Sequence, residues 1–255
     1  MMIDLSGQAA LVTGSSRGIG RKCALKLAQA GADIIVNYVT ARAAAMEVAD
    51  LVVALGRRAL VVKADVSQQD DVQSMLEFVA QQWGRLDILV SNAATGGFRP
   101  LLESREQHFD AAMKTNVLAL LYLVQAALPL LERHPQRGKV VTISSHGADI
   151  AVPMYGLIGS SKAALESLVR HLTLEVGHRN VNVNCVKAGL VDTDSTRLIP
   201  GAEQMFARRT EKTMMGTRQL EAEDVANVVL FLSSPLSDLI QGQTLTVDGG
   251  AAIHI

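Results

Sequence analysis

Residues 9–20 read AALVTGSSRGIG, four apolar residues that run directly into a turn rich in glycine and serine. The apolar run predicts a short buried strand, and periodic apolar residues after Gly20 predict that a helix follows the turn. Glycines let the backbone of such a turn bend sharply and approach a pyrophosphate, whose charge meets the amino end of the helix. The order of strand, turn and helix therefore predicts a dinucleotide site. The alternative is an ordinary connection between a strand and a helix.

The same alternation of strand and helix continues from this turn to the carboxyl end of the chain. Predicted strands cover Ala9–Val12, Asp33–Asn37, Ala59–Lys63, Leu86–Ser91, Lys139–Ser144, Val181–Val186 and Thr244–Val247. Predicted helices include Arg21–Ala30, Ala43–Leu55, Asp70–Gln82 and Ala163–Gly177. Alternating strands and helices form right-handed crossovers and a parallel sheet. We therefore expect an α/β protein with one Rossmann-like domain over residues 1–255, in which a doubly wound parallel sheet of about seven strands carries helices on both faces.

Two segments, 94–105 and 188–220, do not fit this alternation, and long loops in a compact domain usually serve a function. Both follow predicted strands at the edge of the sheet where ligands bind, and we expect 188–220 to form a substrate-binding loop or lid. Within it, Ile199–Met215 mixes methionine and phenylalanine with Arg208, Arg209 and Lys212. An amphipathic lid of this kind would cover an acyl chain, while its cations met an acidic carrier protein or the phosphates of coenzyme A. The alternative is a solvated helix with an ordinary core face.

The composition excludes several classes of function. Hydrophobic residues make up 49% of the chain and the net charge is −1, so no long-range field collects nucleic acid or an anionic membrane. Cys23 and Cys185 lie in apolar segments without metal-ligand spacing, so we expect no metal site. The amino end does not resemble a signal peptide, and the apolar run Val117–Leu131 is too short to span a bilayer. These features predict a cytoplasmic protein without a membrane partner.

The end of the second predicted strand indicates which dinucleotide is bound. An NAD site places a carboxylate there, about 20 residues after the glycines, to bind the ribose 2′-hydroxyl. This chain reads NYVTAR over residues 37–42, without an acid, and Asp33 lies at the opposite end of the strand. Arg17 and Arg42 are able to supply positive charge to a 2′-phosphate, so the sequence predicts NADPH. The alternative is that both are solvated surface arginines.

The glycine spacing, Gly-x-x-x-Gly-x-Gly, resembles that of the short-chain dehydrogenase/reductase family. The resemblance covers nearly the whole chain and includes Asp65-Val66, Ser91–Ala94, Asn116 and Gln243–Gly250. One departure is Ala188-Gly189, where many members have Pro-Gly. The resemblance implies a set of cofactor-binding residues: Gly14, Ser16, Arg17, Gly18, Ile19, Gly20, Tyr38, Arg42, Asp65, Val66, Asn92, Lys162, Gly189, Val191 and Thr193.

The catalytic segment departs from the usual motif of this family. Ser161–Leu165 resembles the tail of its Tyr-x-x-x-Lys motif, which makes Lys162 the catalytic lysine. The position of the usual tyrosine then holds Ile158, and a tyrosine occurs three residues earlier as Tyr155. On a helix, residues seven apart lie on nearly the same face, about 10 Å apart along the axis. Tyr155 is thus expected to face the same site as Lys162, one turn further away. The alternative is that Tyr155 only packs and the enzyme has lost its acid.

The displaced tyrosine bears on the reaction. In carbonyl reduction the proton donor bonds the oxygen attached to the carbon that receives hydride, whereas in reduction of an enoyl thioester the charge develops on an oxygen two bonds further away. A donor moved back by one turn suits the second reaction better. The Tyr-x6-Lys spacing resembles that of enoyl-acyl carrier protein reductases, and the chain most resembles the bacterial type III group, which favours NADPH.

This resemblance implies NADPH-dependent reduction of the C2=C3 bond of trans-2-enoyl thioesters in fatty acid synthesis, with the substrate on acyl carrier protein or coenzyme A. Tyr155, Lys162, Asn116 and Ser145 form the implied catalytic set, in which Ser144 and Ser145 serve as supporting substrate contacts. Family members also form homotetramers or homodimers through helices beginning near residues 105 and 155. Two alternatives stay open: a ketoreductase of β-ketoacyl, quinone or secondary-metabolite substrates, and a non-catalytic NADPH-binding sensor.

Overall fold

The computed structural model describes residues 3–199 and 201–253, in which seven parallel strands form one sheet in the order β3-β2-β1-β4-β5-β6-β7. The strands are β1 (Ala9–Val12), β2 (Asp33–Tyr38), β3 (Ala59–Lys63), β4 (Ile88–Ser91), β5 (Gly138–Ser145), β6 (Val181–Ala188) and β7 (Thr244–Val247). The central strands are buried on both faces, which explains why their sequences are continuous apolar runs and do not alternate with polar residues. The sheet confirms the predicted fold class.

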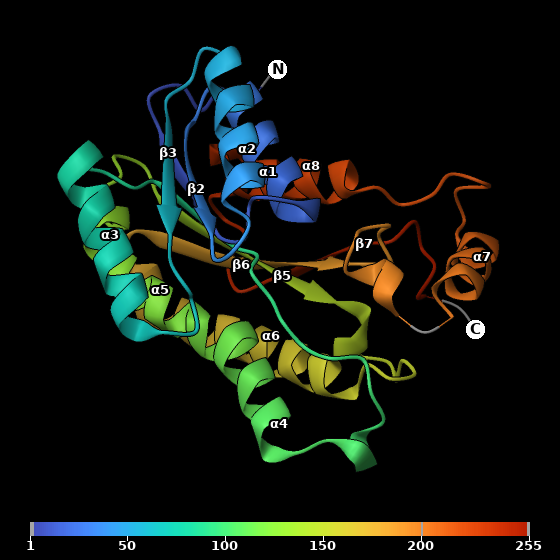
Figure 1. The fold of residues 1–255 in the computed structure, drawn as a ribbon. Helices are drawn as coiled ribbons and strands as arrows, with labels where there is room; N and C mark the ends of the chain where they lie inside the picture. The colour runs from blue at the N-terminus through green and yellow to red at the C-terminus, as the bar shows by residue number, and fades with distance from the viewer. Residues whose placement is uncertain (1–2, 200, 254–255) are drawn as a thin grey trace.

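Helices cover both faces of the sheet (Figure 1). One layer contains α1 (Gly18–Gln29), α2 (Arg42–Ala54) and α8 (Ala222–Leu232), and the other contains α3 (Gln69–Trp83), α4 (Glu106–Met113), α5 (Ala119–Leu131) and α6 (Gly156–Val176). Two apolar cores result, one on each face of the sheet. The helix α7 (Ala202–Lys212) stands apart from these layers, beyond the carboxyl ends of β5, β6 and β7 (Figure 1).

The strand order reverses between β1 and β4, and this reversal positions the site. From β1 the chain moves outward through β2 and β3, and it then returns to add β4 to β7 on the other side. Ligands of such sheets bind in the crevice that the reversal opens beyond the carboxyl ends of the strands. The segments that follow β1, β4, β5 and β6 all meet there.

The helix α6 begins at Gly156, whereas the sequence predicted a start at Ala163. Glycine is a poor helix former, and Gly156 and Gly159 obscured the first two turns. The structure gives Gly159 a packing role, because a Cβ atom there would lie 2.5 Å from the backbone oxygen of Gly147. Close contact between the helix and the segment after β5 thus requires a residue that weakens the local signal.

The elements α4 and α5 join through a π-helical segment, Lys114–Leu118, into one helix over Glu106–Leu131. By length and composition this helix could cross a membrane, with a mean hydropathy of 1.4 in its most apolar window, and half of that window is buried inside the protein. The sequence had identified only its second half as an apolar run. Its apolar face packs on the sheet through side chains that include Leu120, Leu123 and Leu131.

Candidate active site

The turn after β1 has the backbone geometry expected of a phosphate-binding loop. Gly14 and Gly18 have φ angles of +61° and +56°, a left-handed backbone conformation that residues with a side chain rarely adopt. Gly20 has no room for a side chain, since a Cβ atom there would lie 2.6 Å from the Gly14 oxygen and 2.5 Å from the Asn92 amide nitrogen. The helix α1 starts at Gly18, so its free backbone amides face the end of the turn.

Two amide side chains, the buried Asn37 and the half-buried Asn92, hold this turn in place. The Asn37 side chain accepts a hydrogen bond from the backbone nitrogen of Gly14 at 3.1 Å and donates one to the Ala64 oxygen at 3.0 Å. Asn92 donates to the Thr13 oxygen at 2.9 Å. The sequence pointed to Asn92, but it treated Asn37 only as the absence of an acid. Asn37 is in fact the residue that ties the turn to β2 and β3.

A cleft of about 490 Å³ extends from this turn to the catalytic segment. It brings together most of the residues that the sequence assigned to the cofactor and catalysis, which are Gly14, Ser16, Arg17, Gly18, Ile19, Tyr38, Asp65, Val66, Asn92, Ser145, Tyr155, Lys162, Gly189, Val191 and Thr193. Gly20, Arg42 and Asn116 do not line it. Gly20 acts behind the turn, and Arg42 lies in an adjoining hollow.

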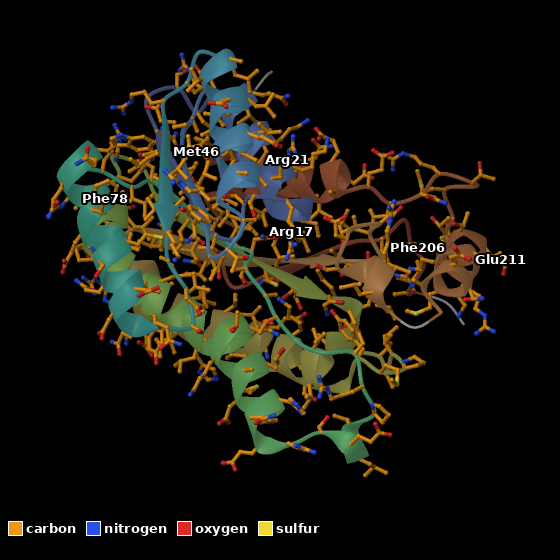
Figure 2. The ribbon with its side chains drawn as sticks, in the orientation of Figure 1. Arg17, Arg21, Met46, Phe78, Phe206 and Glu211 are labelled. Carbon is orange, nitrogen blue, oxygen red and sulfur yellow. The ribbon has the colours of Figure 1, made fainter. Side chains whose placement is uncertain are left out.

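That adjoining hollow lies where the second ribose of a dinucleotide would end. Tyr38, Thr40, Arg42 and Lys63 line it, and Tyr38 and Lys63 are register partners at the ends of β2 and β3. No carboxylate lines the hollow among the described residues. The exposed guanidinium of Arg17, at the start of α1, borders the neighbouring cleft (Figure 2). The glycine turn, with its free backbone amides, and the cations beside it fit a dinucleotide with an additional phosphate. The sequence missed Lys63, whose place becomes visible only through strand pairing.

Lys162 is buried at the floor of the cleft. Its ammonium donates a hydrogen bond to the Ile143 backbone oxygen at 2.7 Å, which fixes the side chain against β5. Burial lowers the pKa of Lys162 to about 8, against a smaller opposing effect of the Glu166 carboxylate. The amine is therefore mainly protonated at neutral pH, but it is close to releasing its proton.

Tyr155 reaches the same cleft, although it is the capping residue in front of α6 and not part of the helix. The sequence-based picture of two residues on one continuous helical face is corrected here, because the helix starts one residue after the tyrosine. The Tyr155 ring stacks on Phe98 with centroids 6.1 Å apart and packs on the backbone of Gly147. Burial raises the pKa of the Tyr155 phenol, and the hydroxyl of Ser145 partly offsets that rise.

Ile158, at the usual tyrosine position, points elsewhere. Its side chain is 7% exposed and belongs to the wall beside Gly96, where a Cβ atom would lie 2.3 Å from the Ile158 Cγ1 atom. It does not line the cleft. Among the described residues that line the cleft together with Lys162, only Tyr38 and Tyr155 carry a phenol.

The two serines after Ile143 have separate roles, which the sequence did not distinguish. Ser145 lies beside Tyr155, whereas the hydroxyl of Ser144 donates a hydrogen bond of 2.5 Å to the buried carboxylate of Glu166. Asn116 is also buried, in the π-helical segment. Its amide donates to the Thr95 oxygen at 2.9 Å and to the Ser161 hydroxyl at 2.8 Å, so it joins the segment after β4 to α6.

The predicted lid contains α7, with Phe206 on the side toward the body of the molecule and Glu211 on the outer side (Figure 2). Met205 and Phe206 are half-buried, as expected for an amphipathic lid, and Arg208 is exposed. Arg209 differs from the expectation because it turns inward. Its guanidinium contacts the His146 imidazole and lies 3.4 Å from the Asp248 carboxylate, so a buried acid directs it away from solvent.

Among residues 3–199 and 201–253, no group of three or more His, Cys, Asp or Glu side chains is arranged to hold a metal ion. Cys23 and Cys185 are buried free thiols, and burial raises the pKa of each to about 12. The reactive groups that line the cleft include the Tyr155 phenol, the Lys162 amine and the hydroxyls of Ser144 and Ser145.

A protein family described as enoyl-(acyl carrier protein) reductase matches residues 14–252, which is nearly all of the chain. Together with the glycine turn, the sheet order and the tyrosine–lysine cleft, this match decides the family. The chain is a short-chain dehydrogenase/reductase. It is therefore an oxidoreductase, and the family predicted from the sequence is confirmed.

Named relatives of this short-chain dehydrogenase/reductase are reductases of several kinds. The chain is 35% identical to 1-cyclohexenylcarbonyl-CoA reductase of Streptomyces collinus over 247 residues, covering 96% of this chain and 87% of the relative. It is 34% identical to the hydroxynaphthalene reductase-like protein of Metarhizium acridum over 259 residues, covering 97% and 96%.

Solved structures with the same fold include both a dehydrogenase and a ketoreductase. A short-chain dehydrogenase of Burkholderia cenocepacia in complex with NADP has a TM-score of 0.86 and 35% identity, covering 97% of this chain and 98% of its own. The landomycin C-6 ketoreductase with bound NADP and rabelomycin has a TM-score of 0.86 and 34% identity, covering 98% of each. As a set, these names agree better with the carbonyl-reducing alternative than with fatty acid enoyl reduction.

Proposed function

We propose that this oxidoreductase reduces the C2=C3 double bond of an α,β-unsaturated acyl thioester with NADPH. The observation that carries the proposal is the placement of Tyr155 in the cleft while the usual tyrosine position holds the buried, inward-packed Ile158. The phenol at this end of the described cleft is that of Tyr155, which lies beside Ser145 and Phe98. The proposal does not require the substrate to be a fatty acyl chain.

The residues of the cleft have separate tasks in this reaction. When bound, NADPH supplies the hydride that C3 of the substrate receives. Negative charge then develops on the thioester oxygen, and the Tyr155 hydroxyl donates a hydrogen bond to it. Lys162 would hold the nicotinamide ribose, and its ammonium keeps positive charge beside the tyrosine. C2 is afterwards protonated by solvent or by Tyr155.

The choice of NADPH is supported by charge at the far end of the cleft. Arg42 and Lys63 line the hollow where a 2′-phosphate would lie, Arg17 borders the cleft beside it, and no described carboxylate lines the hollow to bind a 2′-hydroxyl. A dianionic phosphate gains charge-assisted hydrogen bonds from such groups, whereas a hydroxyl does not. The bound NADP of the Burkholderia relative is in keeping with this choice.

The form of the thioester is also part of the proposal. The name of the Streptomyces relative joins a conjugated alkene to a coenzyme A thioester, which is the chemistry proposed for this cleft. The exposed Arg208 on α7 is available for an acidic carrier, but Arg209 is committed to Asp248. We therefore favour a coenzyme A thioester over one on acyl carrier protein.

Carbonyl reduction is the second candidate, favoured by one observation in the cleft. Ser145 and Tyr155 lie together, and a pair of hydroxyls beside a protonated lysine is able to polarise a single carbonyl oxygen. The names of the hydroxynaphthalene reductase-like and ketoreductase relatives favour the same reaction.

The deciding experiment follows NADPH absorbance with the purified protein and matched thioesters. We expect kcat/KM with crotonyl-CoA to exceed that with acetoacetyl-CoA, and a cyclic enoyl-CoA to be reduced as well. A higher value for acetoacetyl-CoA or for an aromatic ketone would instead select carbonyl reduction. Cofactor binding without turnover of any of these compounds would favour a sensor. Crotonyl groups on acyl carrier protein, measured beside the coenzyme A ester, test the choice of carrier.

A further inference from the structure

A lysine is buried directly beneath the catalytic segment. Lys187 lies near the end of β6, is 6% exposed, and follows three residues on the same face of the strand that are apolar, Val181, Val183 and Cys185. Its ammonium lies 3.1 Å from the Glu166 carboxylate and forms a second ion pair with Asp149. Two carboxylates thus hold one cation at a position that continues an apolar row.

Burying such a group is costly for folding alone. A buried charge must be paired and hydrogen-bonded, and well-packed apolar residues of similar volume often stabilise a protein at least as well. Here every member of the group has a partner: Glu166, itself 8% exposed, accepts a hydrogen bond from Ser144 with one oxygen and faces Lys187 with the other. Stability of the sheet alone therefore does not explain why Lys187 and its carboxylate partners are buried here.

The network connects the fixed part of the site to the segment that carries the tyrosine. Lys187 belongs to β6, Ser144 to β5 and Glu166 to α6, one turn after Lys162. Asp149 belongs to the segment after β5 that leads to Tyr155, and its side chain is 59% exposed. The ion pair with Lys187 attaches the middle of that segment to β6, while His146 at its start faces Asp248, which follows β7, at 3.1 Å.

The displaced tyrosine needs such an attachment. A tyrosine at position 158 would be held by the hydrogen bonds of α6, but Tyr155 precedes the helix, and only its backbone oxygen joins it, at 2.8 Å from the Gly159 nitrogen. The preceding residue, Met154, has a φ angle of +64°, which an L-residue adopts at a cost. The position of the phenol therefore depends on its packing on Phe98 and Gly147 and also on what holds the segment in front of it, where the Arg99 backbone nitrogen donates to the Met154 oxygen at 2.9 Å.

We propose that Lys187 is a positioning residue, which through its ion pair with Asp149 holds the segment before α6 so that Tyr155 faces the substrate. Glu166 keeps the lysine in place and in turn is fixed by Ser144. This inference rests on the proposed role of Tyr155 in the reaction. Lys187 itself touches neither the cleft nor the reacting atoms.

Four variants test the proposal: Lys187→Met, Lys187→Arg, Asp149→Asn and, as a matched control, Lys26→Met. Lys26 forms a partly buried ion pair with Glu223 in the opposite layer, so its loss removes a similar charge pair far from the segment. We expect Lys187→Met to lower kcat by about 10–100-fold, as a misplaced catalytic group does. Asp149→Asn should reproduce most of the loss, Lys187→Arg should restore much of it, and the NADPH dissociation constant should change little.

A second readout does not depend on the substrate. Ultraviolet titration of the wild type minus that of Tyr155→Phe isolates the Tyr155 phenol. Burial is the larger of the two effects on this group, so release of the segment should lower its pKa toward the ordinary value. We expect that fall in Lys187→Met and in Asp149→Asn but not in Lys26→Met.

The outcomes separate this inference from the proposed function. Unchanged kcat and an unchanged Tyr155 titration in Asp149→Asn would overturn it; the Asp149 side chain is 59% exposed, so this substitution should cost little stability even where Lys187→Met does not fold. An equal effect of Lys26→Met would also overturn it, because the loss would then reflect general destabilisation. If Tyr155→Phe keeps full activity, the proposed reaction fails, yet the titration still decides whether Lys187 positions the phenol.

Discussion

At the cofactor end of the cleft, neutral groups hold the backbone: the Asn37 and Asn92 amides bond the turn, and Gly20 allows it to pack closely. At the substrate end, charged groups hold segments outside the sheet: Lys187 holds Asp149, and Arg209 of α7 reaches Asp248. Neutral hydrogen bonds to the backbone keep their strength over a wide pH range, whereas ion pairs depend on protonation and on salt. The first end is therefore built to stay fixed, and the second is built to be adjustable.

The largest effect should come from the substrate end. Tyr155→Phe removes only the hydroxyl that stabilises the developing oxyanion, and we expect kcat to fall by about 10²–10³-fold. The NADPH dissociation constant should stay nearly constant, because the phenyl ring retains its packing on Phe98 and Gly147. Single-turnover kinetics and fluorescence titration measure the two quantities. Full activity in this variant would show that the two ends do not divide the work in this way.

At the cofactor end, Gly20→Ala should give the next largest effect. The added carbon would approach the Gly14 oxygen to 2.6 Å, so the turn must shift, at a cost of about 1–3 kcal/mol. We expect weaker NADPH binding by about 10–100-fold, with kcat at saturating cofactor less affected. Gly177→Ala is the control, since its added carbon meets only the end of the Gln241 side chain. Equal losses in both variants would contradict a local role.

The pH dependence should reveal the amine at the floor of the cleft. Burial lowers the pKa of Lys162 to about 8, so the ammonium is present below that pH and is lost above it. We expect kcat/KM to decline above about pH 8, by up to tenfold for each further pH unit if the charge is essential. A profile that stays level to about pH 10 would contradict this assignment.

A smaller change is expected at the far end of the cofactor. Arg42→Ala should raise the KM for NADPH by about tenfold and leave the KM for NADH almost unchanged, because only NADPH has the phosphate. Arg179→Ala, which removes an exposed arginine paired with Glu132 elsewhere, is the control. A stronger preference for NADH in the wild type would disprove the assignment of this hollow.

The smallest change should come from the lid. Arg209→Met removes the contact of α7 with His146 and Asp248, and we expect the substrate KM to rise a few-fold with little change in kcat. The Asp248 carboxylate would remain satisfied, because the backbone nitrogens of Gly250 and Ala252 also donate to it. Steady-state kinetics with short and long acyl chains would measure the effect. No change in KM for any chain length would mean that α7 does not cover the substrate.

The sequence was most informative where neighbours along the chain determine the structure. Strands β1, β3 and β7 were predicted with the observed bounds, because short runs of apolar and β-branched residues are local signals. The glycine turn and the Tyr155–Lys162 spacing were recognisable for the same reason. The start of α6 was missed, since Gly156 and Gly159 weaken a local signal in favour of packing on Gly147.

The contacts that hold the site were beyond such reasoning. Glu166 belongs to α6 and Lys187 to β6, and no local sequence pattern predicts that the two charges form an ion pair. The same holds for Asn37 under the glycine turn and for Arg209, whose inward direction depends on Asp248. Long-range pairing of buried polar groups is decided by the finished fold, so sequence patterns identify the reactive residues better than their supports.

The wall formed by Gly96 and Ile158 makes it difficult to place a phenol at position 158. A Cβ atom at position 96 would lie 2.3 Å from the Ile158 Cγ1 atom, so Ile158 already fills the space beside Gly96. A tyrosine at 158 is larger than the isoleucine, and Gly96 has no side chain whose removal would make room for it. A change of substrate is therefore easier to obtain through the loops that surround Tyr155 than through a second phenol at position 158.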